Sequence, residues 1–160
     1  MIFVLACICT CSFAQNKMFP KGEVVVSAGR SYFVATSLGW GGSVDYSLTS
    51  FNRFSVGIGL VGSGFSYQVE NNGNGYLPRR DLIICPDVSL HMDIVANWEL
   101  YLKAGFGVMH RVTEEATGNL VKNGAMFDTA IGTRINIFKG LGVYAQIGLP
   151  VSAVGLCFAF

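Results

Sequence analysis

The chain ends on LGVYAQIGLPVSAVGLCFAF, residues 141–160, and this stretch decides the fold. Its apolar residues recur at every second position, which is the period of β-strands with one apolar face. They are Leu141, Val143, Ala145, Ile147, Leu149, Val154, Leu156, Phe158 and Phe160. In a soluble sheet, so apolar a terminal strand would leave a sticky edge unless a partner strand or lipid covered it. We therefore expect a hairpin whose last strand closes onto the first strand of the chain.

The composition fits strands that carry their hydrophobicity on one face. Of the 160 residues, 51% are hydrophobic and only 13% are charged, and this length predicts a single domain. After the first 14 residues the sequence shows alternation nearly throughout, instead of the helical stripes or continuous apolar strands of an apolar soluble protein. Lipid-facing barrel strands require such alternation. The net charge of +1 argues against a nucleic-acid partner.

The first 14 residues, MIFVLACICTCSFA, are typical of the end of a secretory signal peptide, because an apolar run finishes on a small-x-small cleavage pattern. The run is shorter than the ~20 helical residues that span a bilayer. Its basic start is missing, since Lys17 is the first charge, so we expect either that the true start lies upstream or that the start codon is misassigned. Residues 22–160 are expected to form the barrel domain, with Cys85 and Cys157 as free thiols.

Six earlier stretches alternate with the same period and bring the expected number of strands to eight. In the third of them the apolar parity slips near Gly62 and Gly64, which predicts a β-bulge. Pro86 is expected to interrupt one ladder bond of the fourth. The expected strands ahead of the closing hairpin cover residues 23–30, 40–49, 54–69, 82–94, 98–108 and 127–137.

The connections between the expected strands fall into two length classes. Short turns follow the second, fourth and sixth strands, whereas longer segments follow the first, third and fifth, at residues 32–39, 70–79 and 114–124. Residues 70–79, ENNGNGYLPR, hold two Asn-Gly pairs and a proline, so we expect an exposed loop there and no strand. Short periplasmic turns and longer extracellular loops would place both chain ends on the periplasmic side.

Aromatic residues gather at the two ends of the expected strands. Two such belts suit a membrane with two interfaces. The belt beside the short turns would comprise Phe51, Phe54, Trp98, Phe138 and Phe160, and the opposite belt Trp40, Tyr67, Tyr76 and Phe127.

The ending Gly155-x-x-Phe158-x-Phe160 resembles the carboxy-terminal assembly signal of outer-membrane β-barrels. With its eight strands, signal peptide and belts, the chain resembles the small outer-membrane barrels of the OmpA transmembrane domain and OmpX-like group. The resemblance implies an all-β fold: an eight-stranded antiparallel up-and-down transmembrane β-barrel in the bacterial outer membrane. It also implies a structural or adhesive role. The implied partners are outer-membrane lipid, the barrel-assembly machinery through the last strand, and an extracellular partner through the loops 32–39, 70–79 and 114–124.

The inward parity of the later strands carries the candidate site. An eight-stranded barrel is just wide enough to be filled by side chains, which excludes a wide porin channel. Because unpaired buried charges are costly, we expect the inward charges to form an ion-paired plug, with a gated conduction path as the alternative. The expected polar network is His91, Asp93, Glu99, Lys103, Arg134, Tyr144 and Gln146.

We expect no catalytic, cofactor or metal site. His110 has the outward parity of a lipid A deacylase-like site. Arg111, Val112 and Thr113 follow it and do not form the His-x-Ser pattern of that family, so we interpret it as a rim histidine. The two histidines and the two cysteines that remain after signal cleavage lack ligand spacing. The competing hypothesis is a soluble, secreted lipocalin-like barrel with its apolar parity inside around a small apolar ligand. A lipid-modifying barrel enzyme is the lesser alternative.

Overall fold

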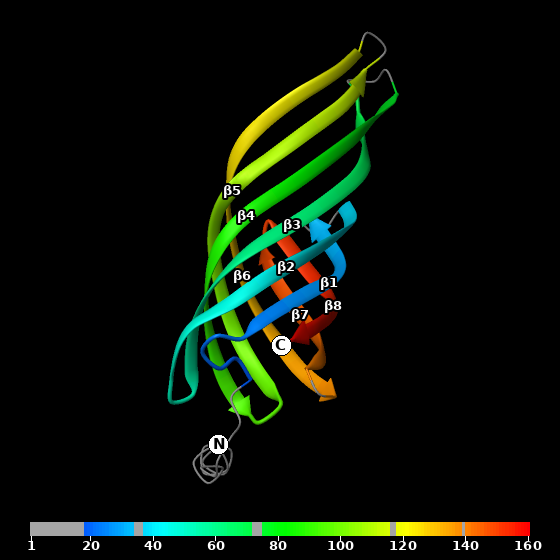
Figure 1. Cartoon of the computed structure of the whole chain (residues 1–160). Helices are drawn as coiled ribbons and strands as arrows, with labels where there is room; N and C mark the ends of the chain where they lie inside the picture. Colours follow the sequence, from blue (N-terminus) through cyan, green and yellow to red (C-terminus); the bar gives the residue numbers. More distant parts are fainter. Residues whose placement is uncertain (1–17, 34–36, 72–74, 116–117, 139) are drawn as a thin grey trace, which may run out of the picture.

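The computed structural model describes residues 18–33, 37–71, 75–115, 118–138 and 140–160. The expected signal peptide, residues 1–14, lies outside these ranges. The described residues form one closed antiparallel ring in which each strand pairs with its neighbours in sequence, and the last pairs with the first (Figure 1). The eight strands are β1 (Val24–Phe33), β2 (Ser37–Phe51), β3 (Phe54–Glu70), β4 (Tyr76–Val95), β5 (Trp98–Glu115), β6 (Gly118–Phe138), β7 (Leu141–Leu149) and β8 (Val151–Ala159). The predicted eight-stranded up-and-down barrel is confirmed. Among the described residues, no helix is long and apolar enough to cross a membrane.

The terminal strand closes the ring, as its apolar character predicted. β8 pairs with β1 from Phe33 opposite Val151 to Val25 opposite Ala159. The backbone contact continues to the chain end, where Phe160 and Val24 exchange two hydrogen bonds of 3.0 Å. No edge of β8 is therefore left open along this seam.

The apolar parity of the strands faces outward and the polar parity faces the lumen. On β5, Leu102 and Phe106 are 53% and 66% exposed, whereas the intervening Lys103 is only 6% exposed. Ile147 on β7 is 76% exposed. A lipocalin-like barrel would need the opposite arrangement, with its apolar side chains around an internal ligand, so the observed faces argue against that alternative.

The predicted β-bulge near Gly62 and Gly64 is wrong. β3 keeps its register with β4 throughout, and its pairing with β2 shifts only near the turn that joins them. What changes at the glycines is the character of the two faces: farther along β3 the inward side chains are Phe65 and Tyr67, while Ser66 faces outward. Tyr67 consequently points into the structure and does not belong to an outer aromatic belt.

The three expected long loops are mostly strand, which corrects their assignment. β1 and β2 leave only residues 34–36 between them, β3 and β4 leave 71–75, and β5 and β6 leave 116–117. Gly75 lies between β3 and β4 and has a φ of +98°, and residues 72–74 lie outside the described ranges. Alternation and cross-strand pairing continue through the rest of the expected loop. The polar segments therefore belong largely to paired strands and not to loops.

Strands β3 to β6 rise beyond the closed ring as a four-stranded sheet (Figure 1). Pairing of β2 with β3 stops at Phe65, and pairing of β6 with β7 starts only at Thr129. Residues 66–70 of β3 and 118–128 of β6 are thus the two edges of this extension. At the opposite end of the barrel the connections are the predicted short turns, including the one where Asn52 has a φ of 49°.

The aromatic side chains otherwise fall near the expected ends of the strands. Phe51, Phe138 and Phe160 are each at least 66% exposed at the end with the short turns. Trp40 and Phe127 are 63% and 61% exposed toward the other end. Tyr76 lies beyond them, at the tip of the extension. The exterior between the two groups is an almost continuous apolar band.

Candidate functional site

The seven residues of the expected polar network all lie on the lumen side of the ring. Six are buried and Gln146 is partly buried. They come from four neighbouring strands: His91 and Asp93 from β4, Glu99 and Lys103 from β5, Arg134 from β6, and Tyr144 and Gln146 from β7.

Glu99 is the centre of a first ion-paired layer. It is fully buried and lies directly opposite Arg134 in the β5–β6 ladder, where the guanidinium Nη2 donates to Glu99 Oε1. The same carboxylate oxygen lies 3.0 Å from His91 Nδ1. The other imidazole nitrogen, Nε2, is 2.9 Å from Ser89 Oγ. Both ring nitrogens of His91 are therefore engaged inside the lumen.

Lys103 forms a second layer with residues that the expected network did not include. Its Nζ lies 2.5 Å from Oδ1 of Asp45 on β2 and 4.0 Å from Oδ2 of Asp87 on β4. Asp128 on β6 is also buried and close enough to interact electrostatically with Lys103. Inward parity, visible in the sequence, was the signal that could have identified these three carboxylates.

Tyr101 on β5 and Gln146 on β7 are connected inside the lumen across the intervening strand β6. The Tyr101 hydroxyl donates to Gln146 Oε1 at 3.1 Å. The phenol ring lies over Gly132, its partner on β6, where an added Cβ would come within 2.3 Å of Tyr101 Cζ. A glycine is required at this position because the large inward side chain occupies the space of a neighbour.

A short segment before β1 enters the barrel at the end with the short turns. Phe19 is fully buried, with its ring centroid 4.2 Å from that of His91 and 5.4 Å from the Arg134 guanidinium carbon. Its carbonyl accepts a hydrogen bond of 3.2 Å from Ser47 Oγ, and the Met18 amide donates to Asp93 Oδ1 at 3.3 Å. Sequence analysis missed this plug because a single phenylalanine outside the alternating stretches has no periodic signal.

Glu23 lies between this plug and the first residue of β1. Burial raises the pKa of Glu23 to about 7. The carboxylates of Glu99 and Asp93 add to this effect, and the positive charge of Arg134 opposes it. Glu23 therefore places a carboxyl group with a pKa near neutrality at the end of the barrel with the short turns.

An apolar cluster fills the opposite end of the lumen. Phe65, Ile83 and Val151 are at most 3% exposed and form its centre. Above it, at the base of the extension, Arg111 donates from Nε and Nη2 to the two carboxylate oxygens of Asp81 at 2.9 Å each. Polar and apolar layers therefore close both ends of the lumen.

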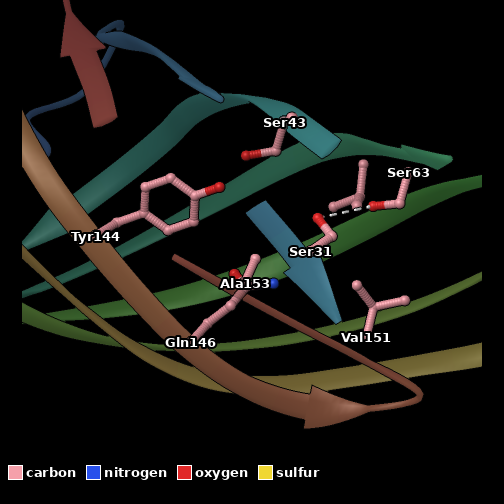
Figure 2. A pocket seen from close by; sticks show the side chains of 9 residues that line it. Ser31, Ser43, Ser63, Tyr144, Gln146, Val151 and Ala153 are labelled. Carbon is pink, nitrogen blue, oxygen red and sulfur yellow. Dashed lines mark hydrogen bonds between the residues drawn. The ribbon is translucent and has the colours of Figure 1, made fainter. Parts of the chain in front are cut away.

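The space left inside the ring is small. One cavity, shown in Figure 2, is lined by Ser31, Ser43, Ser63, Tyr144, Gln146, Val151 and Ala153, among others, and has a volume of ≈ 10 Å³. A second, beside Lys103, has the same volume. Each offers room for about one water molecule, and neither resembles a cavity for an organic ligand.

The remaining candidate residues lie apart from this network. His110 faces outward, with Nδ1 2.6 Å from Asn123 Oδ1. Cys85 and Cys157 are buried and free, as predicted. Gly155 of the carboxy-terminal pattern faces the β1 seam, where an added Cβ would meet the Ala28 carbonyl oxygen at 2.2 Å. The rings of Phe158 and Phe160 lie together on the exterior, with centroids 5.1 Å apart.

Comparison with known proteins places the fold among solved outer-membrane barrels. No family model matches the chain, and no curated protein matches its sequence. The structure is similar to Ail, the attachment invasion locus protein of Yersinia pestis, with a TM-score of 0.59 and 13% identity over 88% of this chain and 99% of that one. Ail in complex with the heparin analogue sucrose octasulfate matches with a TM-score of 0.59 and 14% identity over 88% and 99% of the two chains. The N-terminal β-barrel domain of Pseudomonas aeruginosa OprF matches with a TM-score of 0.55 and 17% identity over 88% and 98%. The chain has the fold of the small eight-stranded outer-membrane barrels.

Proposed function

We propose that this chain is an integral outer-membrane protein whose closed barrel holds a four-stranded sheet outside the membrane for surface contacts. Its role is structural or adhesive, and it is not an enzyme. The apolar exterior band supports a position in lipid, since solvent-exposed strands would place polar side chains there. Both described chain ends lie at the end with the short turns, which is the periplasmic end in this proposal (Figure 1).

The filled lumen supports a closed barrel instead of a conducting one. Two ion-paired layers, centred on Glu99 and Lys103, lie between the Phe19 plug and the apolar cluster around Phe65. Separating the partners of such a pair leaves uncompensated buried charges, so opening the layers carries a large free-energy cost. The network acts as a structural seal.

A non-enzymatic role is consistent with the surroundings of both histidines. His91 is enclosed by Glu99, Ser89 and the Phe19 ring, which leaves no room for a substrate. In the part of the chain that the structure describes, His110 Nδ1 hydrogen-bonds to the amide oxygen of Asn123, and no hydroxyl or thiol nucleophile is a hydrogen-bond partner of its ring. These surroundings favour a structural role for His91 in the lumen and a position for His110 at the membrane–water interface.

The carboxy-terminal strand is the proposed contact for the barrel-assembly machinery. It is the eighth strand of the ring and pairs with β1, and the absence of a side chain at Gly155 permits the close approach of the Ala28 backbone at this seam. Before closure, β8 would offer both a free backbone edge and the two exterior aromatic rings of Phe158 and Phe160.

The open edge of β6 is the observation that carries the surface role. Residues 118–128 pair with β5 on one side, and the β6–β7 ladder begins only after them, at Thr129. An exposed strand edge can bind an extended segment of a partner through main-chain hydrogen bonds. One solved neighbour of the same fold is named an attachment protein, which fits an adhesive use of this sheet.

A matched pair of substitutions tests the edge directly. Val121 on β6 and Val112 on β5 are cross-strand partners on the same face, but only Val121 belongs to the edge strand. Bacteria that display the protein should adhere to cultured epithelial monolayers. V121K should reduce adherence because edge lysines block strand addition, whereas V112K should not. Equal losses of adherence in V121K and V112K would contradict the β6 edge as the contact. If bacteria that display the original protein adhere no better than bacteria without it, the adhesive role is contradicted.

A further inference from the structure

The exterior of the barrel carries a groove floored by glycines across β2 and β3. Gly42, Gly62 and Gly64 are on the outward face, and an added Cβ at Gly62 or Gly64 would meet nothing within 4 Å. The groove consists of two hollows of ≈ 490 and ≈ 410 Å³ that share Leu82 as a wall. Because Gly42, Gly62 and Gly64 lie close together and carry no side chains, the outward surface is hollowed between the larger side chains around them.

The two halves of the groove differ in chemistry. The half nearer the middle of the barrel is bordered by Val26, Val44, Leu60, Leu82 and Ile84. Its walls are aliphatic on every side, which suits a hydrocarbon chain lying along the strands. The half nearer the extension is bordered instead by Trp40 and by the cationic or titratable side chains of Arg30, Arg80 and His110.

Arg30 supplies an available positive charge at the lower border of that second half. Its guanidinium carbon lies 3.9 Å from the ring centroid of Trp40, its partner on β2. Among the described residues no carboxylate lies within ion-pair distance of Arg30, whereas Arg80 is paired with Glu114 at 3.1 Å. A guanidinium that lies over an indole ring retains N–H groups that can donate to a phosphate.

The polar residues are spread along the barrel axis. Cross-strand partners on successive strands form rows around the barrel. The row that begins at Val24, at the end with the short turns, reaches Leu149 at the opposite end of β7. Each row therefore moves toward the extension on going from β1 to β7. Arg30 and His110 lie in one row, four strands apart. At a spacing of ~4.8 Å and a tilt of ~40°, His110 lies roughly 12 Å farther out than Arg30.

We propose that this groove binds a phosphorylated glycolipid of the outer leaflet, with an acyl chain over Gly42 and Gly62 and the anionic sugar headgroup against Arg30 and Trp40. An extended headgroup with several polar groups matches the spread from Arg30 to His110 better than a single phosphate does. This site takes its position in the membrane from the proposed function, but its chemistry rests on the groove itself.

Trp40 gives a direct readout of binding. The chain has two tryptophans, so W98F leaves Trp40 as the reporter inside the groove. The full chain is folded in phosphocholine nanodiscs, folding is verified by gel mobility, and a bisphosphorylated, acylated glucosamine disaccharide is titrated. Trp40 fluorescence should change saturably. The dephosphorylated disaccharide should bind about tenfold more weakly, because the charge-assisted contacts are lost.

Substitutions then separate the two halves of the groove. G62L places a side chain in the open space above the floor, where an added Cβ meets nothing within 4 Å, and R30Q removes the charge; each should weaken binding about fivefold or more. A104L is the matched control, because Ala104 faces outward on β5 outside the groove. Native mass spectrometry counts bound lipid independently of the fluorescence, which R30Q alone could alter.

Three outcomes would overturn the proposal. They are equal binding by G62L, R30Q and A104L, equal affinity for the dephosphorylated disaccharide, and equal affinity for phosphatidylglycerol, which would make the occupant an ordinary anionic phospholipid. A protein that fails the gel-mobility control would count against the membrane barrel and not against the groove. Failure of the two proposals is therefore distinguishable.

Discussion

Lys103 on β5 and Asp45 on β2 form an ion pair across the barrel lumen, with Nζ 2.5 Å from Oδ1. Two strands separate β2 from β5 in the ring, so the pair joins parts of the wall that share no backbone hydrogen bonds. Both side chains are at most 6% exposed. Such contact requires a narrow ring, and it links distant strands through the lumen.

Replacing Lys103 should destabilise the barrel strongly. K103M leaves Asp45 and the nearby Asp87 without their cation, which should cost about 3–5 kcal/mol of unfolding free energy. Urea unfolding of the protein in phosphocholine micelles measures the cost. The double variant K103M/D45N should recover part of it, because the uncompensated charge of Asp45 is gone. A loss of unfolding free energy in the double variant equal to the sum of the losses in K103M and D45N would contradict a coupled pair.

Phe19 should contribute to stability although it precedes the first strand. F19A removes a fully buried ring between His91 and Arg134 and should cost about 3–5 kcal/mol. F51A is the matched control, since Phe51 is 74% exposed at the same end of the barrel. The same urea titration compares them. Equal costs for the two variants would show that Phe19 does not occupy the lumen.

The depth of an outward-facing position in the membrane should decide how much an arginine substitution there lowers the unfolding free energy. L102R places a charge in the middle of the apolar band and should cost about 2–4 kcal/mol in lipid. V121R places the same charge on the water-facing extension, where we expect a change within about 0.5 kcal/mol. Folding yield and unfolding free energy in phosphocholine vesicles measure both. An L102R variant that assembles as well as V121R would contradict the orientation of the band.

Glu23 should make stability depend on pH below neutrality. Burial raises the pKa of this carboxyl from its usual 4.5 to about 7 in the folded protein, so the folded state binds more protons than the unfolded chain in this window. Its contribution therefore favours folding below about pH 4.5 and is lost as the pH rises through about 7. The unfolding free energy of E23Q relative to the unmodified protein should increase over that range. A constant difference would contradict the raised pKa.

The sequence was sufficient for the ring because the strand period is local. Leu102 and Lys103 alternate in the sequence, and their opposite exposures in the structure follow from that period alone. The slip inferred at Gly62 failed because it relied on strands having one apolar face throughout, whereas farther along β3 Phe65 faces inward and Ser66 outward. The loop inferred at residues 70–79 failed because its turn residues were taken to extend over a segment that is paired strand from Tyr76 onward.

The candidate site was less predictable than the ring because it depends on contacts between distant strands. Parity placed Glu99 and Arg134 on the same side, and their adjacency follows from neighbouring strands. The partner of Lys103 was not among neighbouring strands, so Asp45 was overlooked. Met18 and Phe19 carry no period at all, and only the tertiary structure reveals their position in the lumen.

The central claim, a closed barrel with its apolar face in lipid, is tested most directly by gel mobility. The protein is extracted from an outer-membrane fraction and run with and without boiling. A closed barrel resists the detergent and migrates differently until it is heated. We predict this heat-dependent shift, with the protein absent from the soluble fraction. Soluble protein without a mobility shift would contradict the account.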